Sequence, residues 1–577
     1  MDYKKEFEYW LEKTSSEELK AIQGDEKEIK ERFYTRLAFG TAGMRGTVEL
    51  GTNRMNVYTV SAATKGLADY INSIGKADKG VAISYDTRRC STTFALEAAK
   101  VLSANKIKVY LFENVRPVPV ISYTVRHLGC IAGIMITASH NPKEYNGYKV
   151  YGEDGAQMSP EATAVVVDFI DKINDYFSIE KDEAEGLNEE DIRGKDNYKI
   201  NDYITVIGNS VNESYYKEIE GLSLSPEAVK KYASALKIVY TPIHGSGYVP
   251  VTDMLTRMGI PFTVVKEQAM PDTEFSTVSV PNPENPNALS MGIELAKKIG
   301  ATVVIGTDPD CDRMGVAVMK RNGEFFLLNG NQIGCLLMDY ILQRRQALGT
   351  LPKNAATIKT IVTSSLAKKI SESYGAVNFD VLTGFKFIGE KIKEWEQTGE
   401  YTYVFGFEES YGSLAGTHAR DKDAVVATML FAEMVCYYKG LDILVSERLE
   451  EIFKKFGYYA DKAVSLVFKG LDGMDKMNAI MDKLHTLRPE KIGDTQIEFI
   501  SDYQKRTTYN KDGSIDMITL PKTNAVYYGL EGGNWLCVRP SGTEPKLKIY
   551  VSISDKISEQ NAHEKADKLI EEIQKLF

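Results

Sequence analysis

Cysteine is scarce in this 577-residue chain, and the six cysteines are scattered without a CxxC pair. That spacing predicts neither a disulfide framework nor a zinc site, and it favours buried thiols in a reducing cytoplasm. No apolar run approaches the roughly 18 residues of a membrane span. The first ten residues mix both charge signs and contain no apolar stretch of the signal-peptide kind. We therefore expect a cytoplasmic protein with no signal peptide and no membrane segment.

The chain also lacks an excess of positive charge, because 80 acidic and 70 basic residues give a net charge of −10. This balance argues against broad nucleic-acid binding and against binding to an anionic membrane surface. An anionic substrate would have to be held by local basic loops. The length suggests about four domains, the composition is that of an ordinary globular protein, and nothing in the residues names a protein partner.

A strand, helix, strand pattern recurs three times along the chain. A polar loop follows the first strand of each copy, and this order at this spacing is that of a βαβ crossover, which implies parallel sheets. In chain order, the predicted segments are 80–84, 92–103 and 107–112; 236–240, 251–258 and 262–265; and 360–362, 366–373 and 379–382.

A second polar loop, again after a strand-like run, lies 50 to 70 residues beyond the start of each copy. These loops are 137–142, 307–313 and 406–412. Three similar α/β domains that each offer one loop can line a shared cleft, because ligands of parallel sheets bind where the strands end.

The part after residue 457 differs, with strand-like runs, a hairpin turn at Gly532-Gly533 and a final charged helix over 559–577. We therefore predict three similar α/β domains with mixed or parallel sheets, followed by an α+β domain. The predicted boundaries are 1–205, 206–325, 326–456 and 457–577.

The strongest single signal is the series Asp308, Asp310 and Asp312. Alternate carboxylates cluster for a hard divalent cation, and an oxygen-only donor set favours Mg²⁺ over zinc. An EF-hand loop also begins in this way, but Arg313 takes the place of its glycine and Met319 the place of its last glutamate. A solvated acidic turn is the simpler alternative.

Two further loops suit phosphate chemistry. Ser139 follows an apolar run over 130–136, so we expect it at the end of a buried strand, where an exposed serine suits a nucleophile. A plain turn is the alternative. Arg45 stands in the glycine-rich stretch 39–46, where its guanidinium can fork onto a phosphate.

The remaining candidates are loops that can hold a sugar phosphate. Glu408 and Ser410 offer an acceptor and a donor for neighbouring hydroxyls, although a helix cap is the alternative. A phosphate cradle is predicted from Arg539, Ser541, Gly542 and Thr543. Further substrate-binding candidates, each of which can equally be an ordinary loop residue, are Arg313, Thr383, Gly384, Lys386, His418 and Lys422.

Together the stretches 39–46, 137–142, 308–313, 406–412 and 539–543 resemble the signature loops of the α-D-phosphohexomutases. The chain looks most like phosphoglucomutases of the long bacterial type, which are related to eukaryotic phosphopentomutase. One departure is Phe407, which stands where many members of the family have a glycine before the glutamate.

The resemblance implies four domains around a central cleft. Ser139 would carry a phosphoryl group and, with the three aspartates, would bind Mg²⁺. Glu408 and Ser410 would hold sugar hydroxyls, and the loop at Arg539 would hold the phosphate that does not react.

The implied reaction is interconversion of glucose 1-phosphate and glucose 6-phosphate. Phosphorylated Ser139 would give its phosphoryl group to O6, and the resulting glucose 1,6-bisphosphate would return its other phosphate to Ser139. Mg²⁺ and Arg45 would stabilise the transferring group. Lys149 is the expected general base, with His140 and His418 as alternatives.

Three other readings stay open. Phosphomannomutase or phosphopentomutase activity uses the same chemistry. A phosphoserine hydrolase would pass its phosphoryl group to water, and a sensor of sugar phosphates would need no chemistry at all. The triplet Glu408, Glu409 and Ser410 favours glucose because it resembles the phosphoglucomutase form of that loop.

Overall fold

The computed structural model describes residues 2–40, 43–468, 473–541 and 546–577. They form two compact units that the chain enters more than once. Unit 1 comprises Met1–Leu328, Gly389–Gln397 and Gly412–Asp442, and unit 2 comprises Asn329–Ile388, Thr398–Tyr411 and Ile443–Phe577.

The first sheet of unit 1 is mixed and has a buried parallel centre. Strand β2 pairs in parallel with β3 and β4, β3 pairs in parallel with β7, and β5 pairs antiparallel with both β4 and β1. Helix α5, the helix of the first predicted crossover, contacts β2, and α6 contacts it as well. In sheet order the strands are β1 (Gly43–Thr47), β5 (Tyr145–Gly152), β4 (Ala132–Ile136), β2 (Val81–Tyr85), β3 (Val109–Phe112), β7 (Ile204–Ile207) and β6 (Tyr198–Lys199).

The second sheet of unit 1 repeats this plan with five strands among the described residues. Strands β10, β8 and β9 run parallel, while β11 returns antiparallel beside β10. Helix α12 packs on β8 and β10 through small and aliphatic side chains such as Ala296. In sheet order the strands are β12 (Phe325–Leu328), β11 (Met314–Met319), β10 (Val303–Thr307), β8 (Ile238–Thr241) and β9 (Phe262–Val264).

Most helices of unit 1 flank these two sheets, and three short ones precede them. They are α1 (Tyr3–Thr14), α2 (Glu17–Ala21), α3 (Glu26–Phe33), α4 (Val57–Ser73), α5 (Ser91–Ala104), α6 (Val118–Leu128), α7 (Pro160–Asp171), α8 (Glu189–Ile192), α9 (Asn209–Glu220), α10 (Pro226–Tyr232), α11 (Tyr248–Met258), α12 (Pro286–Ile299) and α16 (Ala424–Lys439). The short strand β16 (Ser413–Ala415) also belongs to unit 1.

Unit 2 begins with the third copy, in which β14 (Val377–Val381), β13 (Ala355–Thr360) and β15 (Thr402–Phe407) are parallel. The prediction of its first strand at 360–362 was wrong, because β13 ends where that segment begins. Polar residues at alternate positions make β13 hard to recognise as a buried strand from the sequence. In the fold, the Thr357 hydroxyl bonds to Ser371 at 2.8 Å and Lys359 pairs with Asp380 at 3.0 Å.

The helices of this region are α13 (Gly330–Ala347), α14 (Ser365–Ser373) and α17 (Val445–Phe456), and α15 (Phe385–Thr398) is shared between the two units. Helix α13 packs against β15 at Gly334, where an added Cβ would lie only 2.1 Å from the Phe407 ring. The unusual Phe407 is therefore accommodated by a glycine on the neighbouring helix.

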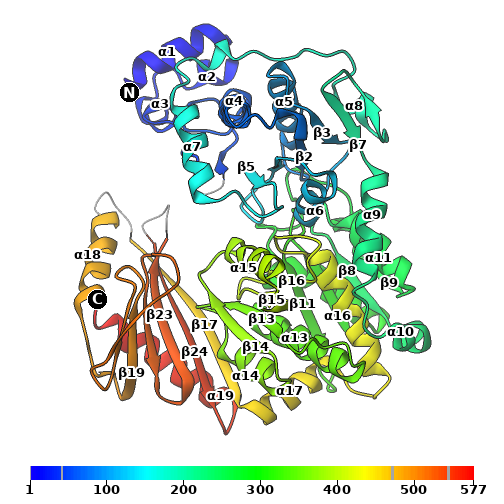
Figure 1. Cartoon of the computed structure of the whole chain (residues 1–577), viewed down its shortest axis with the longest axis vertical. Coiled ribbons are helices and arrows are strands. Elements are labelled where there is room, and N and C mark those ends of the chain that lie inside the picture. Colours follow the sequence, from blue (N-terminus) through cyan, green and yellow to red (C-terminus); the bar gives the residue numbers. More distant parts are fainter. Residues whose placement is uncertain (1, 41–42, 469–472, 542–545) are drawn as a thin grey trace. The chain divides into compact units, whose positions relative to one another are not determined.

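The rest of unit 2 is an antiparallel sheet of eight strands among the described residues, as expected for an α+β domain. Figure 1 shows β17, β24 and β23 side by side in it. Gly532 and Gly533, with φ of 75° and 76°, form the predicted hairpin turn between β22 and β23. The elements are β17 (Tyr458–Val467), β24 (Lys546–Asp555), β23 (Asn534–Pro540), β22 (Val526–Leu530), β19 (Thr495–Asp502), β20 (Thr507–Asn510), β21 (Ile515–Met517), β18 (Lys491–Ile492), α18 (Gly473–Thr486) and α19 (Glu559–Gln574).

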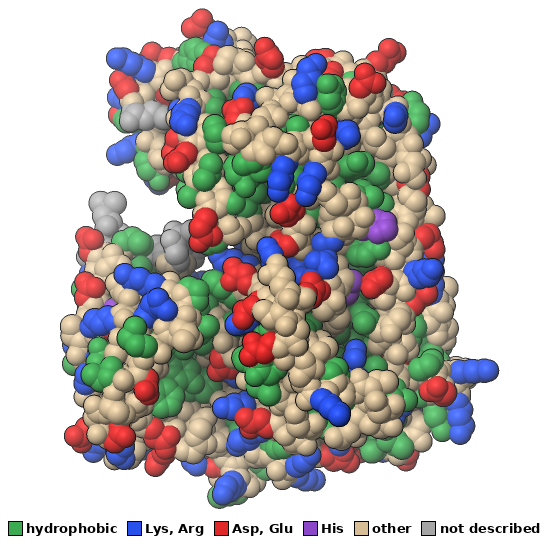
Figure 2. Space-filling view, viewed as in Figure 1, with side chains coloured by type: hydrophobic (Ala, Val, Ile, Leu, Met, Phe, Trp, Pro, Cys, Tyr) green, Lys and Arg blue, Asp and Glu red, His purple; other side chains and the backbone are tan. Residues whose placement is uncertain are grey.

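The predicted fold class, with three similar α/β sheets and a C-terminal α+β region, is confirmed. None of the helices in the described part of the chain combines the length and apolar character of a membrane span. On the face drawn in Figure 2, acidic and basic side chains are interspersed. This pattern suits a protein that holds charged ligands by local loops.

Candidate functional site

Ser139 lies just beyond the carboxyl end of β4, in the loop predicted to carry the nucleophile. Its φ of 53° is unusual for a residue with a side chain. The Ser139 N–H donates to the Thr137 hydroxyl at 2.8 Å, and Ser139 Oγ donates to Asp308 Oδ2 at 3.1 Å. The serine hydroxyl of the first sheet therefore contacts the acidic loop of the second.

A positive φ recurs at a non-glycine residue in each of the three second loops. Besides Ser139, Cys311 has a φ of 51° and Tyr411 a φ of 69°. Such a conformation turns the chain sharply and costs free energy, so it persists only where neighbouring groups hold it. Each of the three loops therefore contains a residue in the left-handed conformation shortly after its strand.

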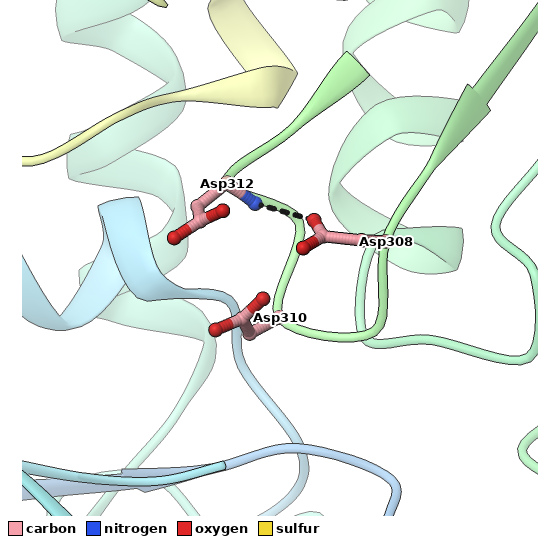
Figure 3. A group of neighbouring side chains, drawn as sticks. All are labelled: Asp308, Asp310 and Asp312. Carbon is pink, nitrogen blue, oxygen red and sulfur yellow. Dashed lines mark hydrogen bonds between the residues drawn. The ribbon is translucent and has the colours of Figure 1, made fainter. Parts of the chain in front are cut away.

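The three aspartates lie between β10 and β11 and point toward one another (Figure 3). One carboxylate oxygen from each of Asp308, Asp310 and Asp312 lies within 4.8 Å of the others. The backbone N–H groups of Asp312 and Arg313 both donate to Asp308 Oδ1 at 3.0 Å, which fixes the turn. The predicted acidic cluster is formed, and all three side chains are buried.

Two lysines from distant parts of unit 1 form ion pairs with this cluster. Lys149 on β5 pairs with Asp310 at 2.9 Å, and its side chain is 15% exposed. Lys422 pairs with Asp312 at 3.1 Å and with Asp421 at 2.9 Å. Both lysines were predicted for the site, and each contacts the acids.

The three carboxyls experience different electrostatic surroundings. Burial and the negative charges of Asp310 and Asp312 raise the pKa of Asp308 well above its ordinary value. Burial acts in the same direction on Asp310, but Lys149 overcomes it and holds the pKa of Asp310 below its ordinary value. Burial, followed by the charge of Asp310, raises the pKa of Asp312.

The donor set fits a magnesium ion. Asp310 Oδ1 and Asp312 Oδ1 are buried and have no hydrogen-bond partner among the described residues. A buried carboxylate oxygen without a donor is costly unless a cation satisfies it. Oxygen ligands in a small cluster are those that Mg²⁺ prefers.

The candidate residues Arg45, His140 and His418 of unit 1 differ in how far they are exposed to solvent. Arg45 is exposed and donates to the Asn141 side chain at 3.0 Å. His140 Nδ1 lies 3.2 Å from Ser139 Oγ, and burial with nearby Arg313 and Arg45 lowers the pKa of His140 to about 2. His418 is 7% exposed, and its Nε2 bonds Asp423 at 2.7 Å.

The sugar loop predicted after β15 belongs to unit 2. Glu408 is buried and accepts the Gly384 N–H at 2.9 Å, which joins two stretches that were predicted separately. Ser410 and Thr383 are partly exposed. Lys386 lies near them in sequence, with its ammonium 5.1 Å from the centre of the Phe387 ring.

The predicted phosphate cradle follows β23. Arg539 and Ser541 are both partly exposed, and the Ser541 N–H donates to the Lys546 carbonyl at 2.7 Å. Gly542 and Thr543 lie outside the described residues.

Comparison with known proteins identifies the chain. Models of the phosphoglucomutase/phosphomannomutase α/β/α domains I, II and III match residues 36–177, 213–322 and 329–456. The chain belongs to this family. The resemblance drawn from the five sequence loops is thereby confirmed.

Curated members of the phosphoglucomutase/phosphomannomutase family resemble the chain over nearly its full length. A phosphoglucomutase of Staphylococcus epidermidis is 39% identical over 533 residues, covering 92% of each chain. One of Staphylococcus aureus is 36% identical over 551 residues, covering 95% of each.

Solved structures of the family share the fold. Parafusin, a phosphoglucomutase of Paramecium, superimposes in its open form with a TM-score of 0.68 at 18% identity, covering 94% of this chain and 96% of the other. A family protein of Burkholderia thailandensis gives a TM-score of 0.65 at 15% identity, covering 92% and 96%.

Sequence reasoning missed two acids that support this family's site. Glu284 pairs with Arg313 at 2.6 Å, so the guanidinium has an acidic partner. Asp421 accepts from Lys422 and from the Tyr151 hydroxyl, the latter at 3.0 Å. The alternation of charges at 420–423 was a signal for Asp421, whereas nothing in the sequence near Glu284 indicated a partner.

Proposed function

We propose that the protein is a phosphoglucomutase that interconverts glucose 1-phosphate and glucose 6-phosphate through phosphorylated Ser139 and a glucose 1,6-bisphosphate intermediate. The observation that carries the proposal is the 3.1 Å contact of Ser139 Oγ with an aspartate of the buried triad. It brings a candidate phosphoryl carrier beside a candidate Mg²⁺ site. The curated relatives named phosphoglucomutase support the same substrate.

In the first half-reaction, the bond between phosphorus and Ser139 Oγ breaks as O6 of glucose 1-phosphate bonds to that phosphorus. The product is glucose 1,6-bisphosphate. In the second half-reaction, the 1-phosphate moves to the Ser139 hydroxyl, which leaves glucose 6-phosphate and restores the phosphoserine. Run in reverse, the same steps form glucose 1-phosphate.

Magnesium held by Asp308, Asp310, Asp312 and Ser139 would supply charge neutralisation for the transferring phosphoryl group. The residues themselves also contribute charge. Arg45, exposed beside the serine loop, can donate in a fork to phosphate oxygens.

The O6 proton needs an acceptor, and we assign this role to the neutral amine form of Lys149, because an ammonium has no lone pair for the proton. Lys149 Nζ lies 2.9 Å from Asp310, close to the serine's aspartate partner, so it faces the reacting groups. His140 is a weaker choice, because an imidazole with a pKa of about 2 is unprotonated at neutral pH but has too little affinity for the proton that it must take from O6. His418 is engaged by Asp423.

Unit 2 would bind the parts of the substrate that do not react. Glu408 and Ser410 offer an acceptor and a hydroxyl for the sugar, with Thr383, Gly384 and Lys386 beside them in the chain. Arg539, Ser541, Gly542 and Thr543 would hold the second phosphate, since a guanidinium and hydroxyls match its oxygens. We assign Arg313, His418 and Lys422 of unit 1 to substrate binding in the same way.

The test measures intact mass and isomerisation together. Wild-type protein incubated with glucose 1,6-bisphosphate should gain the mass of one phosphoryl group, and Ser139→Ala should gain none. Isomerisation by Ser139→Ala should fall at least about 10⁴-fold, because no carrier remains. Ser73→Ala, which changes an exposed serine at the end of α4, is the matched control.

Two outcomes would contradict the proposal. Full isomerisation by Ser139→Ala would remove the serine from the reaction. Steady release of inorganic phosphate without formation of the isomer would indicate a hydrolase. Initial rates on glucose, mannose and ribose 1-phosphates compare the three possible sugars, and the proposal expects the highest rate on glucose.

A further inference from the structure

The polar loops that follow the first strand of each copy have no role in the proposed reaction. In the structure each of them contacts the second loop of its own copy. Ser246 donates to the Pro309 carbonyl from both its N–H and its hydroxyl, each at 2.8 Å. Thr363, in the loop after β13, donates to Glu409 at 3.2 Å, and Thr360 at the end of β13 donates to the same carboxylate at 3.3 Å. In these copies, the polar loop after the first strand therefore contacts the second loop, which carries candidate site residues.

The most extensive contact of this kind is made by Arg88, two residues after Asp86 in the loop that follows β2. Its side chain is 0% exposed. The guanidinium donates to four backbone carbonyls, three of them in the Ser139 loop and the fourth at Tyr145, the first residue of β5. They are Ser139 at 2.6 Å, Asn141 at 2.5 Å, Pro142 at 2.9 Å and Tyr145 at 3.2 Å.

Arg88 is itself fixed from two sides. The buried Asp86 carboxylate lies 3.4 Å from its Nε and also accepts the Arg88 N–H at 2.9 Å. The Phe275 ring, from the segment after β9, lies 5.1 Å from the guanidinium carbon. A planar cation held by a carboxylate and a ring presents its donors in one fixed direction.

From this geometry we infer that Arg88 is a positioning residue for phosphoryl transfer, which holds Ser139 in its left-handed conformation with Oγ directed at Asp308. The inference rests on the proposed function for its catalytic consequence. One of the four bonds goes to the carbonyl of Ser139 itself, so it fixes the peptide that follows the strained residue. Three bonds to this loop and one to the start of β5 prevent relaxation to a lower-energy backbone.

Arg88 does not bind the substrate's phosphate directly. It is buried, and its terminal nitrogens already donate to carbonyls. Arg45, in contrast, is exposed and donates to the Asn141 side-chain amide oxygen of this loop. One arginine therefore fixes the loop, and the other is placed to meet a ligand.

The experiment compares Arg88→Lys with Arg89→Lys. Lysine keeps the charge but cannot reach four carbonyls as a planar fork. The neighbouring Arg89 is exposed and donates to the Val48 carbonyl at 2.8 Å, outside the Ser139 loop. Phosphorylation of Ser139 by glucose 1,6-bisphosphate, followed by intact mass, should slow about 100-fold in Arg88→Lys, as expected for a misplaced reacting atom. It should be unchanged in Arg89→Lys.

The KM for glucose 1-phosphate and the affinity for Mg²⁺ should stay at the wild-type values in Arg88→Lys, since neither ligand touches Arg88. Phosphorylation of Arg88→Lys at the wild-type rate would overturn the inference. A raised KM with an unchanged rate would also overturn it, because Arg88 would then contact substrate. If wild-type protein is not phosphorylated at all, the proposed function fails, and the next experiment still decides the role of Arg88.

That experiment uses thermal unfolding and needs no reaction. Glycine adopts a φ of 53° without strain, so Ser139→Gly should change Tm by different amounts in the wild-type and Arg88→Lys backgrounds. Equal shifts would overturn the inference. If Arg88→Lys does not fold but Arg88→Lys with Ser139→Gly does, the coupling is demonstrated. If the double variant is also unfolded, Arg88 supports the whole fold and the inference is wrong.

Discussion

The carboxylates of the acidic loop of unit 1 (307–313) have different partners from those of the acidic loop of unit 2 (406–412). In unit 1, Asp310 and Asp312 each pair with a lysine. In unit 2, Glu409 accepts hydrogen bonds from the Thr360 and Thr363 hydroxyls. Desolvation and the neighbouring Glu408 carboxylate raise the pKa of Glu409 to about 7, although Arg539 acts in the opposite direction.

The difference matches the ligand proposed for each loop. A cluster that must stay ionised to hold a metal needs cationic neighbours, which keep it stable before the metal arrives. A loop that meets sugar hydroxyls needs acceptors and donors of no particular net charge. Four predictions test this contrast, beginning with the largest expected effect.

Removal of one metal acid should have the largest effect on activity. Asp310→Asn is expected to lower the isomerisation rate at least about 1000-fold, because metal stabilisation of the phosphoryl group is worth several kcal/mol. Affinity for Mg²⁺, measured by calorimetry, should fall with it. Asp380→Asn, which changes a half-exposed acid of unit 2, should keep wild-type rate and affinity. A metal affinity unchanged by Asp310→Asn would place the ion elsewhere.

Removal of a paired lysine should have separate effects on the reaction rate and on the stability of the fold. Lys149→Met is expected to slow the reaction about 100-fold through loss of the proton acceptor. Without Mg²⁺ it should also destabilise the fold by about 3 kcal/mol, because Asp310 is left buried and unpaired. Added Mg²⁺ should recover the Tm but not the rate.

The control for this variant is Lys143→Met, which breaks the exposed pair with Glu274 and should change stability by less than about 1 kcal/mol. A chemical step at the wild-type rate in Lys149→Met would exclude Lys149 as the base.

Glu408→Gln should affect substrate affinity and leave the metal site intact. Loss of a charged acceptor for a sugar hydroxyl is worth about 1.5 to 3 kcal/mol, so kcat/KM should fall about 10- to 100-fold. The Mg²⁺ affinity should match that of wild type, since the aspartates belong to unit 1. The exposed Glu400→Gln is the control. Equal kcat/KM in Glu408→Gln and wild type would remove Glu408 from the sugar site.

The smallest effect is expected from Glu409→Gln, as a change in pH dependence. The pKa of Glu409 is raised from 4.5 to about 7 in the folded state, so its contribution to stability is full below pH 4.5 and is lost as the pH rises through 7. The loss amounts to at most about 3 kcal/mol. Between those pH values, Tm should fall less in Glu409→Gln than in wild type or in Glu400→Gln. Parallel profiles would show that Glu409 has an ordinary pKa.

The sequence was sufficient for the elements that local pattern determines. The apolar run before Ser139 predicted β4, and the alternate aspartates predicted a cluster. The strand β13 was misplaced because its polar residues find partners only in the fold. The pairing of Lys149 with Asp310 spans 161 residues and depends on how two sheets pack. The backbone of Ser139 depends on Arg88 and on Asp86, which no local preference reveals.

Ser139 follows a strand of the first sheet of unit 1, whereas the three aspartates follow a strand of the second sheet. This separation has a practical consequence. A chain divided between β7 and β8 would give one fragment with the phosphoryl carrier and another with the metal acids. Neither fragment would contain the whole reaction centre, although hydrogen bonds such as that from the Val118 N–H to the Asp310 carbonyl at 2.9 Å would favour their reassociation. Recovery of isomerase activity on mixing would then report complementation between the halves.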